Sequence, residues 1–81
     1  MKVKSNIAIS DTGFVFDPTT GESYTFNQTG LEIFRMLKEG KVFDEISSLV
    51  ISKYDLDNIV FEKFYYDFIS MLKQYQLLED E

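Results

Sequence analysis

The sequence predicts an α+β fold in which a three-stranded antiparallel sheet is followed by three helices. Residues 1–26 contain short apolar or alternating segments separated by two turn sequences, 11–13 and 17–21. Short turns between successive strands favour an antiparallel meander. From Gln28 onward, the apolar residues recur at helical spacing in three blocks. With 81 residues in all, the chain is expected to form a single domain over residues 1–81.

The first two strands are predicted from alternation and from turn residues. Residues 2–9 alternate between apolar and polar side chains, which predicts a half-exposed first strand. Residues 11–13 form a turn whose glycine can adopt a positive φ. Residues 14–16 are a short apolar second strand, and residues 17–21 are a second turn in which Pro18 presets its own φ.

The joint between the third strand and the first helix is the most informative stretch of the chain. Residues 22–26 are predicted to form the third strand, with its two aromatic side chains on one face. Asn27 follows, where its side chain can accept hydrogen bonds from the first free N–H groups of a helix over residues 28–39. Gly40 comes just after the last periodic apolar residue and predicts a left-handed helix stop.

Two more helices are predicted in the second half. The second covers residues 43–54, and the third covers residues 58–75 with a cap supplied by residues 55–57. The two leucines of residues 77–78 are expected to fold onto the core. The expected buried stripe of the second helix is Ile46, Leu49, Val50 and Tyr54.

The third predicted helix has an unusually wide apolar face. At 100° per residue, nine apolar or aromatic side chains fall within one arc of roughly 180°, whereas sealing a small core needs a stripe of only about 100°. The excess predicts either a helix packed on both sides or a groove along one flank. The residues in the arc are Val60, Phe61, Phe64, Tyr65, Phe68, Ile69, Met71, Leu72 and Tyr75.

The third strand is expected to be open to pairing. Residues 23–26 contain no lysine or proline, the residues that natural edge strands commonly use to prevent pairing. An unprotected edge beside an aromatic helix suits strand addition, in which an extended peptide makes backbone hydrogen bonds and places alternate side chains in pockets.

The composition excludes several classes of function. The chain has no cysteine and no histidine, so it lacks a thiolate nucleophile, a cysteine zinc site and the usual general base. We therefore expect no catalytic residues, no metal and no cofactor. Its formal charge of −6 argues against a nucleic-acid partner, because such binding depends on cations placed on phosphates. No segment resembles a membrane span or a signal peptide, which predicts a cytoplasmic protein without membrane association.

Motifs along nearly the whole chain resemble the PqqD-like family. The most specific part is the Asn-x-Thr-Gly joint and the spaced apolar residues after it. Two positions depart from the family pattern: Gln76 stands where many members have glycine, and Phe64 stands where many have an acidic residue. The motifs are Gly13-Phe14-Val15-Phe16-Asp17-Pro18, Phe26-Asn27-x-Thr29-Gly30-x-x-Ile33, Leu37-x-x-Gly40 and Phe68-Ile69-x-x-Leu72.

The resemblance implies a small winged-helix-like domain and a role in peptide biosynthesis. Members are recognition elements for ribosomally synthesised, post-translationally modified peptides (RiPPs): the leader of a precursor peptide adds as a strand to the third strand, and a separate enzyme modifies it. The ending at residues 75–78 is similar to a subgroup associated with relatives of HPr kinase. Carried onto this sequence, the peptide-binding positions are Ser23, Tyr24, Thr25, Phe26, Phe61, Tyr65, Phe68 and Ile69.

Three other interpretations remain open on the sequence. The chain could be a structural subunit that docks onto a kinase-like or synthetase-like enzyme through the same surface. It could be a winged-helix nucleic-acid binder, although its acidity disfavours this. The open edge could also pair with its own copy, so we expect a monomer or a weak homodimer.

Overall fold

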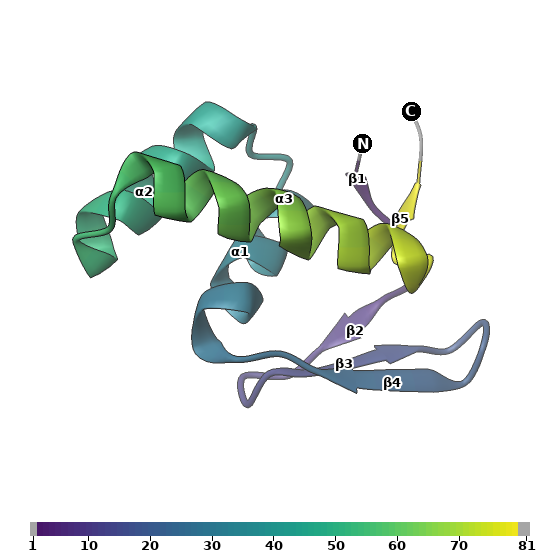
Figure 1. The fold of residues 1–81 in the computed structure, drawn as a ribbon. Helices are drawn as coiled ribbons and strands as arrows, with labels where there is room; N and C mark the ends of the chain where they lie inside the picture. The colour runs from purple at the N-terminus through teal and green to yellow at the C-terminus, as the bar shows by residue number, and fades with distance from the viewer. Residues whose placement is uncertain (1, 80–81) are drawn as a thin grey trace.

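The computed structural model describes residues 2–79 and confirms the α+β architecture. Figure 1 shows α3 extending across the molecule above the hairpin of β3 and β4, with α1 and α2 packed behind and beside it. Its elements are β1 (Lys2–Val3), β2 (Ala8–Ile9), β3 (Phe14–Asp17), β4 (Glu22–Thr25), α1 (Gln28–Lys38), α2 (Phe43–Tyr54), α3 (Asn58–Gln74) and β5 (Leu78–Glu79).

The predicted meander is present as a three-stranded antiparallel sheet in the order β2-β3-β4. Strand β3 lies in the centre, with Phe14 opposite Thr25 and Asp17 opposite Glu22. Gly13 adopts a φ of +93° in the first turn, as expected. In the second turn, the buried Asp17 side chain accepts a hydrogen bond from the Thr19 N–H at 2.9 Å. Because both turns are built from local contacts, they hold the three strands in one register.

The single first strand expected over residues 2–9 is wrong, because the chain breaks at a turn and forms two strands. The Ile7 N–H donates back to the Lys4 carbonyl at 3.4 Å, and the Lys4 N–H donates to the Leu77 carbonyl at 3.0 Å. Strand β1 therefore pairs antiparallel with β5 near the two chain ends, apart from the larger sheet (Figure 1). Val3 and Ile7, on either side of the break, both lie in the core.

The three helices begin and end close to their predicted bounds, and their caps explain why. The Asn27 side chain accepts from the Gly30 N–H at 2.8 Å, and the Asp57 side chain accepts from the Ile59 N–H at 2.8 Å. Gly40 has a φ of +87° and ends α1 in the left-handed conformation. None of the helices within residues 2–79 is long and apolar enough to cross a membrane.

The buried stripe of α2 is narrower than predicted. Ile46 and Val50 are fully buried and Tyr54 is half-buried, but Leu49 is 53% exposed, so its expected burial is wrong. Helix α2 packs against both α1 and α3. Leu49 lies beside these contacts and lines an open hollow between α1 and α2. Helical spacing alone does not tell how far around a helix its neighbours reach.

The core lies between the inner face of the sheet and the helices. Val15 is fully buried on the inner face of β3, whereas Phe14 and Phe16 point to the outer face and are 46% and 36% exposed. Leu77 is fully buried, which confirms the expected folding of the C-terminal leucines. With its inner face against the core, the sheet leaves β4 on the outside as an edge strand.

Candidate functional site

The free edge of β4 is the first component of the site. The Phe26 N–H donates to the Gly13 carbonyl at 2.9 Å, which sets the alternation of hydrogen-bonded pairs along β3 and β4. By this alternation, Tyr24 directs its backbone groups toward β3, whereas Ser23 and Thr25 direct theirs away from it. Within residues 2–79, no strand pairs with that outer edge.

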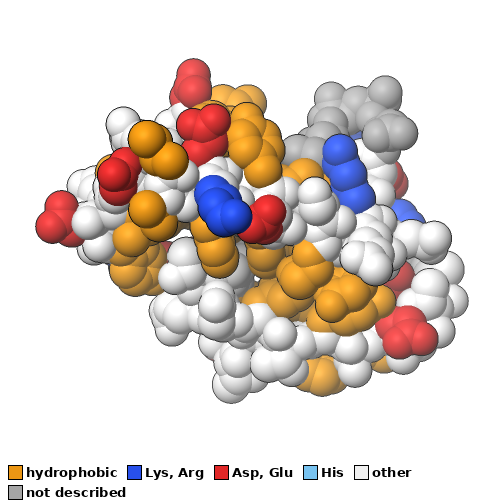
Figure 2. All heavy atoms as spheres, in the orientation of Figure 1, with side chains coloured by type: hydrophobic (Ala, Val, Ile, Leu, Met, Phe, Trp, Pro, Cys, Tyr) orange, Lys and Arg blue, Asp and Glu red, His pale blue; other side chains and the backbone are white. Residues whose placement is uncertain are grey.

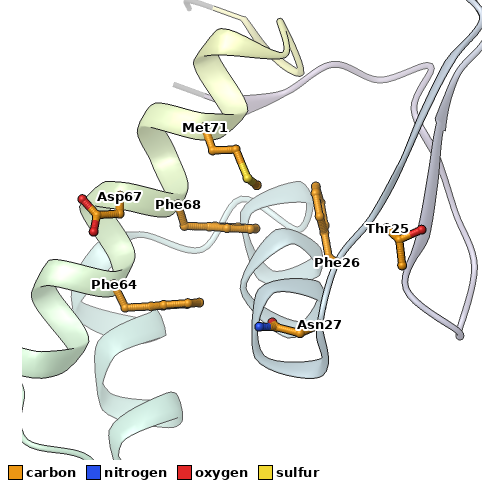
Figure 3. Close-up of a pocket in the computed structure, with 7 residues that line it drawn as sticks. All are labelled: Thr25, Phe26, Asn27, Phe64, Asp67, Phe68 and Met71. Carbon is orange, nitrogen blue, oxygen red and sulfur yellow. The ribbon is translucent and has the colours of Figure 1, made fainter.

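An apolar groove of about 310 Å³ borders this edge. Figure 3 shows its two walls: α3 on one side, and the end of β4 with the start of α1 on the other. Figure 2 shows hydrophobic side chains gathered on the surface between α3 and the hairpin. The lining residues are Thr25, Phe26, Asn27, Phe64, Asp67, Phe68 and Met71.

Phe68 forms the floor where the two walls meet. Its ring lies edge to face with Phe26, with 5.4 Å between centroids, and is stacked with Phe64 at 6.0 Å. Phe26 and Phe68 are both buried, whereas Phe64 and Met71 are half-buried and present part of their surface to the groove. The groove thus has a packed aromatic base and two side chains available for contact.

Gly30 explains how Phe68 can sit so low against α1. A Cβ atom at this position would lie 3.1 Å from the Phe68 Cε1 atom and 3.2 Å from the Asn27 Oδ1 atom. Both distances are shorter than an ordinary van der Waals contact between heavy atoms. The missing side chain at Gly30 therefore gives the ring its place and sets the depth of the groove.

A pair of stacked tyrosines joins β4 to the end of α3. The rings of Tyr24 and Tyr75 are 4.2 Å apart and 11° from parallel. Partial burial, followed by the carboxylates of Glu22 and Asp17, raises the pKa of the Tyr24 hydroxyl. The pair connects the edge strand to the C-terminal end of α3.

The structure brings together only part of the predicted set of site residues. Ser23, Tyr24, Thr25 and Phe26 lie on or next to the free edge, and Phe68 lies in the groove. The other three predicted positions on α3 are core residues that do not line this groove; they are Phe61, Tyr65 and Ile69, with exposed fractions of 0%, 4% and 6%.

On the flank of α3 that faces β4, sequence reasoning named Phe68 but missed Phe64, Asp67 and Met71. This flank carries Phe64, Phe68 and Met71, which follow one another at spacings of four and three residues. Asp67 lies on the same wall and is the charged residue among the lining side chains. The helical spacing was visible in the sequence, but nothing in it showed which flank would turn toward the sheet.

Comparisons with known proteins give a family and a similar solved structure. Residues 13–78 match the family described as "Coenzyme PQQ synthesis protein D (PqqD)". The chain is also similar to the solved structure described as "TbiB1 in Complex with the TbiA(beta) Leader Peptide", with 27% sequence identity and a TM-score of 0.88. That similarity covers 100% of this chain and 98% of the other. A search of curated proteins found no match.

Proposed function

The chain belongs to the PqqD family, and on this premise we propose that it is a non-catalytic adaptor for RiPP biosynthesis. It binds the leader of a ribosomally synthesised precursor peptide and presents the precursor to a separate modifying enzyme. The TbiB1 structure supports this choice of ligand, because that protein is in complex with a leader peptide and is similar to this chain over its full length. The observation that carries the proposal is the outer edge of β4, which pairs with no strand within residues 2–79 and lies beside an apolar groove.

The leader adds to β4 as a further strand. Ser23 and Thr25 direct their backbone N–H and C=O groups to the free edge, and an extended peptide can pair with both residues. Each such hydrogen bond contributes a net ~0.5–1.5 kcal/mol. These bonds are the same for every peptide sequence, so they supply affinity and leave selection to the side chains.

The groove selects the leader through apolar side chains. Every second residue of an added strand points to the same face, so alternate leader side chains lie against Phe64, Phe68 and Met71. Fully burying one such side chain contributes ~1.5–3 kcal/mol. Of the positions predicted on α3, Phe68 makes direct contact, whereas Phe61, Tyr65 and Ile69 act by holding the helix in place.

An NMR titration tests the proposal. The uniformly ¹⁵N-labelled chain is titrated with the small peptide encoded next to its gene. We expect the amide shifts to concentrate at residues 23–27 and 64–71. Shifts scattered elsewhere, or no shifts at millimolar peptide, would refute binding at this edge.

Two substitutions at Thr25 separate the backbone contact from the side chain. Thr25→Pro removes the outward N–H without touching the bonds to β3, because edge strands accept proline where the N–H faces solvent. We expect leader affinity to fall about five- to tenfold. Thr25→Val keeps the N–H and nearly the same shape, so its affinity should stay within about twofold of the parent. Equal affinities for the two variants would contradict strand addition at this residue.

A further inference from the structure

A second hollow, of about 510 Å³, lies at the C-terminal end of α1. It is separate from the groove: Tyr65 of α3 lines this hollow, whereas Phe64 lines the groove. Its floor is apolar, since Val3, Leu37 and Tyr65 are each at most 5% exposed. Burial, and then the neighbouring Tyr66, raises the pKa of the Tyr65 hydroxyl, so the floor adds no negative charge.

The rim of this hollow is positive in a protein that is otherwise acidic. Three of the eight cationic residues of the chain line it, Lys2, Lys38 and Lys41, against one carboxylate, Glu39. The lining itself carries three positive charges and one negative charge, a net of +2, and the whole chain has a formal charge of −6. Glu79 lies 3.6 Å from the Lys2 Nζ atom and lowers the local charge to +1. Such a local reversal of sign attracts acidic partners.

The lysines are held at the rim by contacts of their own. The Lys38 Nζ donates to the Ile7 carbonyl at 2.7 Å, which leaves its other N–H groups available. The Lys41 Nζ lies 3.4 Å from Glu39, and both side chains are partly or fully exposed. A surface pair of this kind contributes little by itself, so a carboxylate of a partner can compete for Lys41.

We propose that this lysine-rimmed hollow binds an acidic segment of the modifying enzyme, with one apolar side chain on the floor and carboxylates against the lysines. The identity of the partner rests on the proposed function, whereas the chemistry of the hollow does not. A segment of a protein fits better than a membrane surface because the apolar floor lies inside a concave site. The leader at β4 and the enzyme segment then occupy different faces, so the adaptor can hold both at once.

An acidic peptide tests the chemistry. The ¹⁵N-labelled chain is titrated with acetylated and amidated Asp-Glu-Leu-Glu-Asp, and with Lys-Lys-Leu-Lys-Lys as the control. We expect millimolar binding of the acidic peptide only, with shifts at residues 2–3, 37–43 and 65. No shifts at 10 mM (about the practical limit for weak binding), equal shifts with the basic peptide, or shifts at residues 23–27 would overturn the proposal. Sedimentation of the chain with phosphatidylserine vesicles would overturn it in favour of a lipid surface.

Charge reversal at two lysines distinguishes binding in the hollow from a general effect of the net charge. Lys41→Glu should lower the affinity for the acidic peptide about five- to tenfold. Lys63→Glu makes the same change in net charge on the exposed surface of α3, outside the hollow, and should leave the affinity unchanged. Equal losses in the two variants would show a general charge effect and would overturn the site.

To test the identity of the partner, calorimetry measures the binding of the modifying enzyme from the same gene cluster to the leader-loaded chain. Lys41→Glu should weaken binding to the enzyme by the same factor and leave leader affinity unchanged. If the leader does not bind but the acidic peptide does, the proposed function fails and the hollow stands. If the leader binds but the enzyme does not distinguish Lys41→Glu from the parent, this inference alone fails.

Discussion

Replacing Gly30 by alanine tests whether the surface of α1 under Phe68 sets the depth of the groove. The new Cβ would lie 3.1 Å from Phe68 Cε1, about 0.4–0.9 Å closer than an ordinary carbon–carbon contact. The ring cannot move deeper, because it already packs against Phe26 and Phe64. It must therefore tilt into the groove.

Two effects of opposite sign determine the stability of this variant. Alanine gains ~0.5–1 kcal/mol over glycine within a helix. Overpacking a buried contact costs ~1–3 kcal/mol. We expect the overpacking cost to dominate, so that Gly30→Ala lowers the free energy of unfolding by about 1 kcal/mol in urea denaturation. The same substitution should weaken leader binding, because the displaced ring obstructs the groove.

A double-mutant cycle identifies the contact responsible. Phe68→Leu removes the ring edge, so in that background Gly30→Ala should cost about 1 kcal/mol less than in the parent chain. Ser48→Ala, on the exposed surface of α2, is the control for helix propensity alone. The reasoning is refuted if Gly30→Ala stabilises the chain as Ser48→Ala does, or if Gly30→Ala and Phe68→Leu are simply additive.

Two further predictions concern a helix end and an ion pair. Gln76 has a φ of +59° just after α3, so Gln76→Gly should raise the free energy of unfolding by about 1 kcal/mol. Gln74→Gly, in the last turn of α3, should lower it, and the reverse order of the two variants in urea denaturation would contradict this reasoning. Partial burial alone would raise the pKa of Glu32, but hydrogen bonds led by the one from Lys53 at 2.6 Å outweigh it and lower the pKa. A lowered pKa stabilises the fold above the ordinary value of 4.5, and this stability is lost as the pH falls through the folded-state pKa. The stability of Glu32→Gln should therefore depend less on pH across that range than the stability of the parent chain, and equal pH profiles would exclude a contribution from the ion pair.

The backbone geometry at Gln76 explains why glycine suits this position, where many family members have it. The Gln76 N–H donates to the Lys73 carbonyl and the Leu77 N–H donates to the Leu72 carbonyl, both at 3.0 Å, which is the Schellman arrangement at the end of α3. Gly40 occupies the corresponding position after α1, with a φ of +87°. A glycine at position 76 would satisfy the same geometry without a Cβ in the left-handed region. The departure from the family pattern thus leaves the turn intact and costs some stability.

The sequence by itself determined the features that depend on residues a few positions apart. Asn27 and Asp57 cap their helices, Gly40 ends α1, and the two turns connect β2, β3 and β4 into a meander, because each requires hydrogen bonds or a φ value within about four residues. The α+β class and the edge position of β4 follow from these local signals and from the short connections.

Tertiary structure decided what depends on distant partners. The break between β1 and β2 arises because Lys4 and Val3 pair with the chain end at residues 77–78, a contact that spans nearly the whole sequence. The wide apolar arc of α3 showed that a groove was possible, but only packing on α1, made close by Gly30, turned the Phe64 flank toward β4. The local free energy of a helix is nearly the same whichever flank faces the sheet, so the surfaces on which the helix packs determine its orientation.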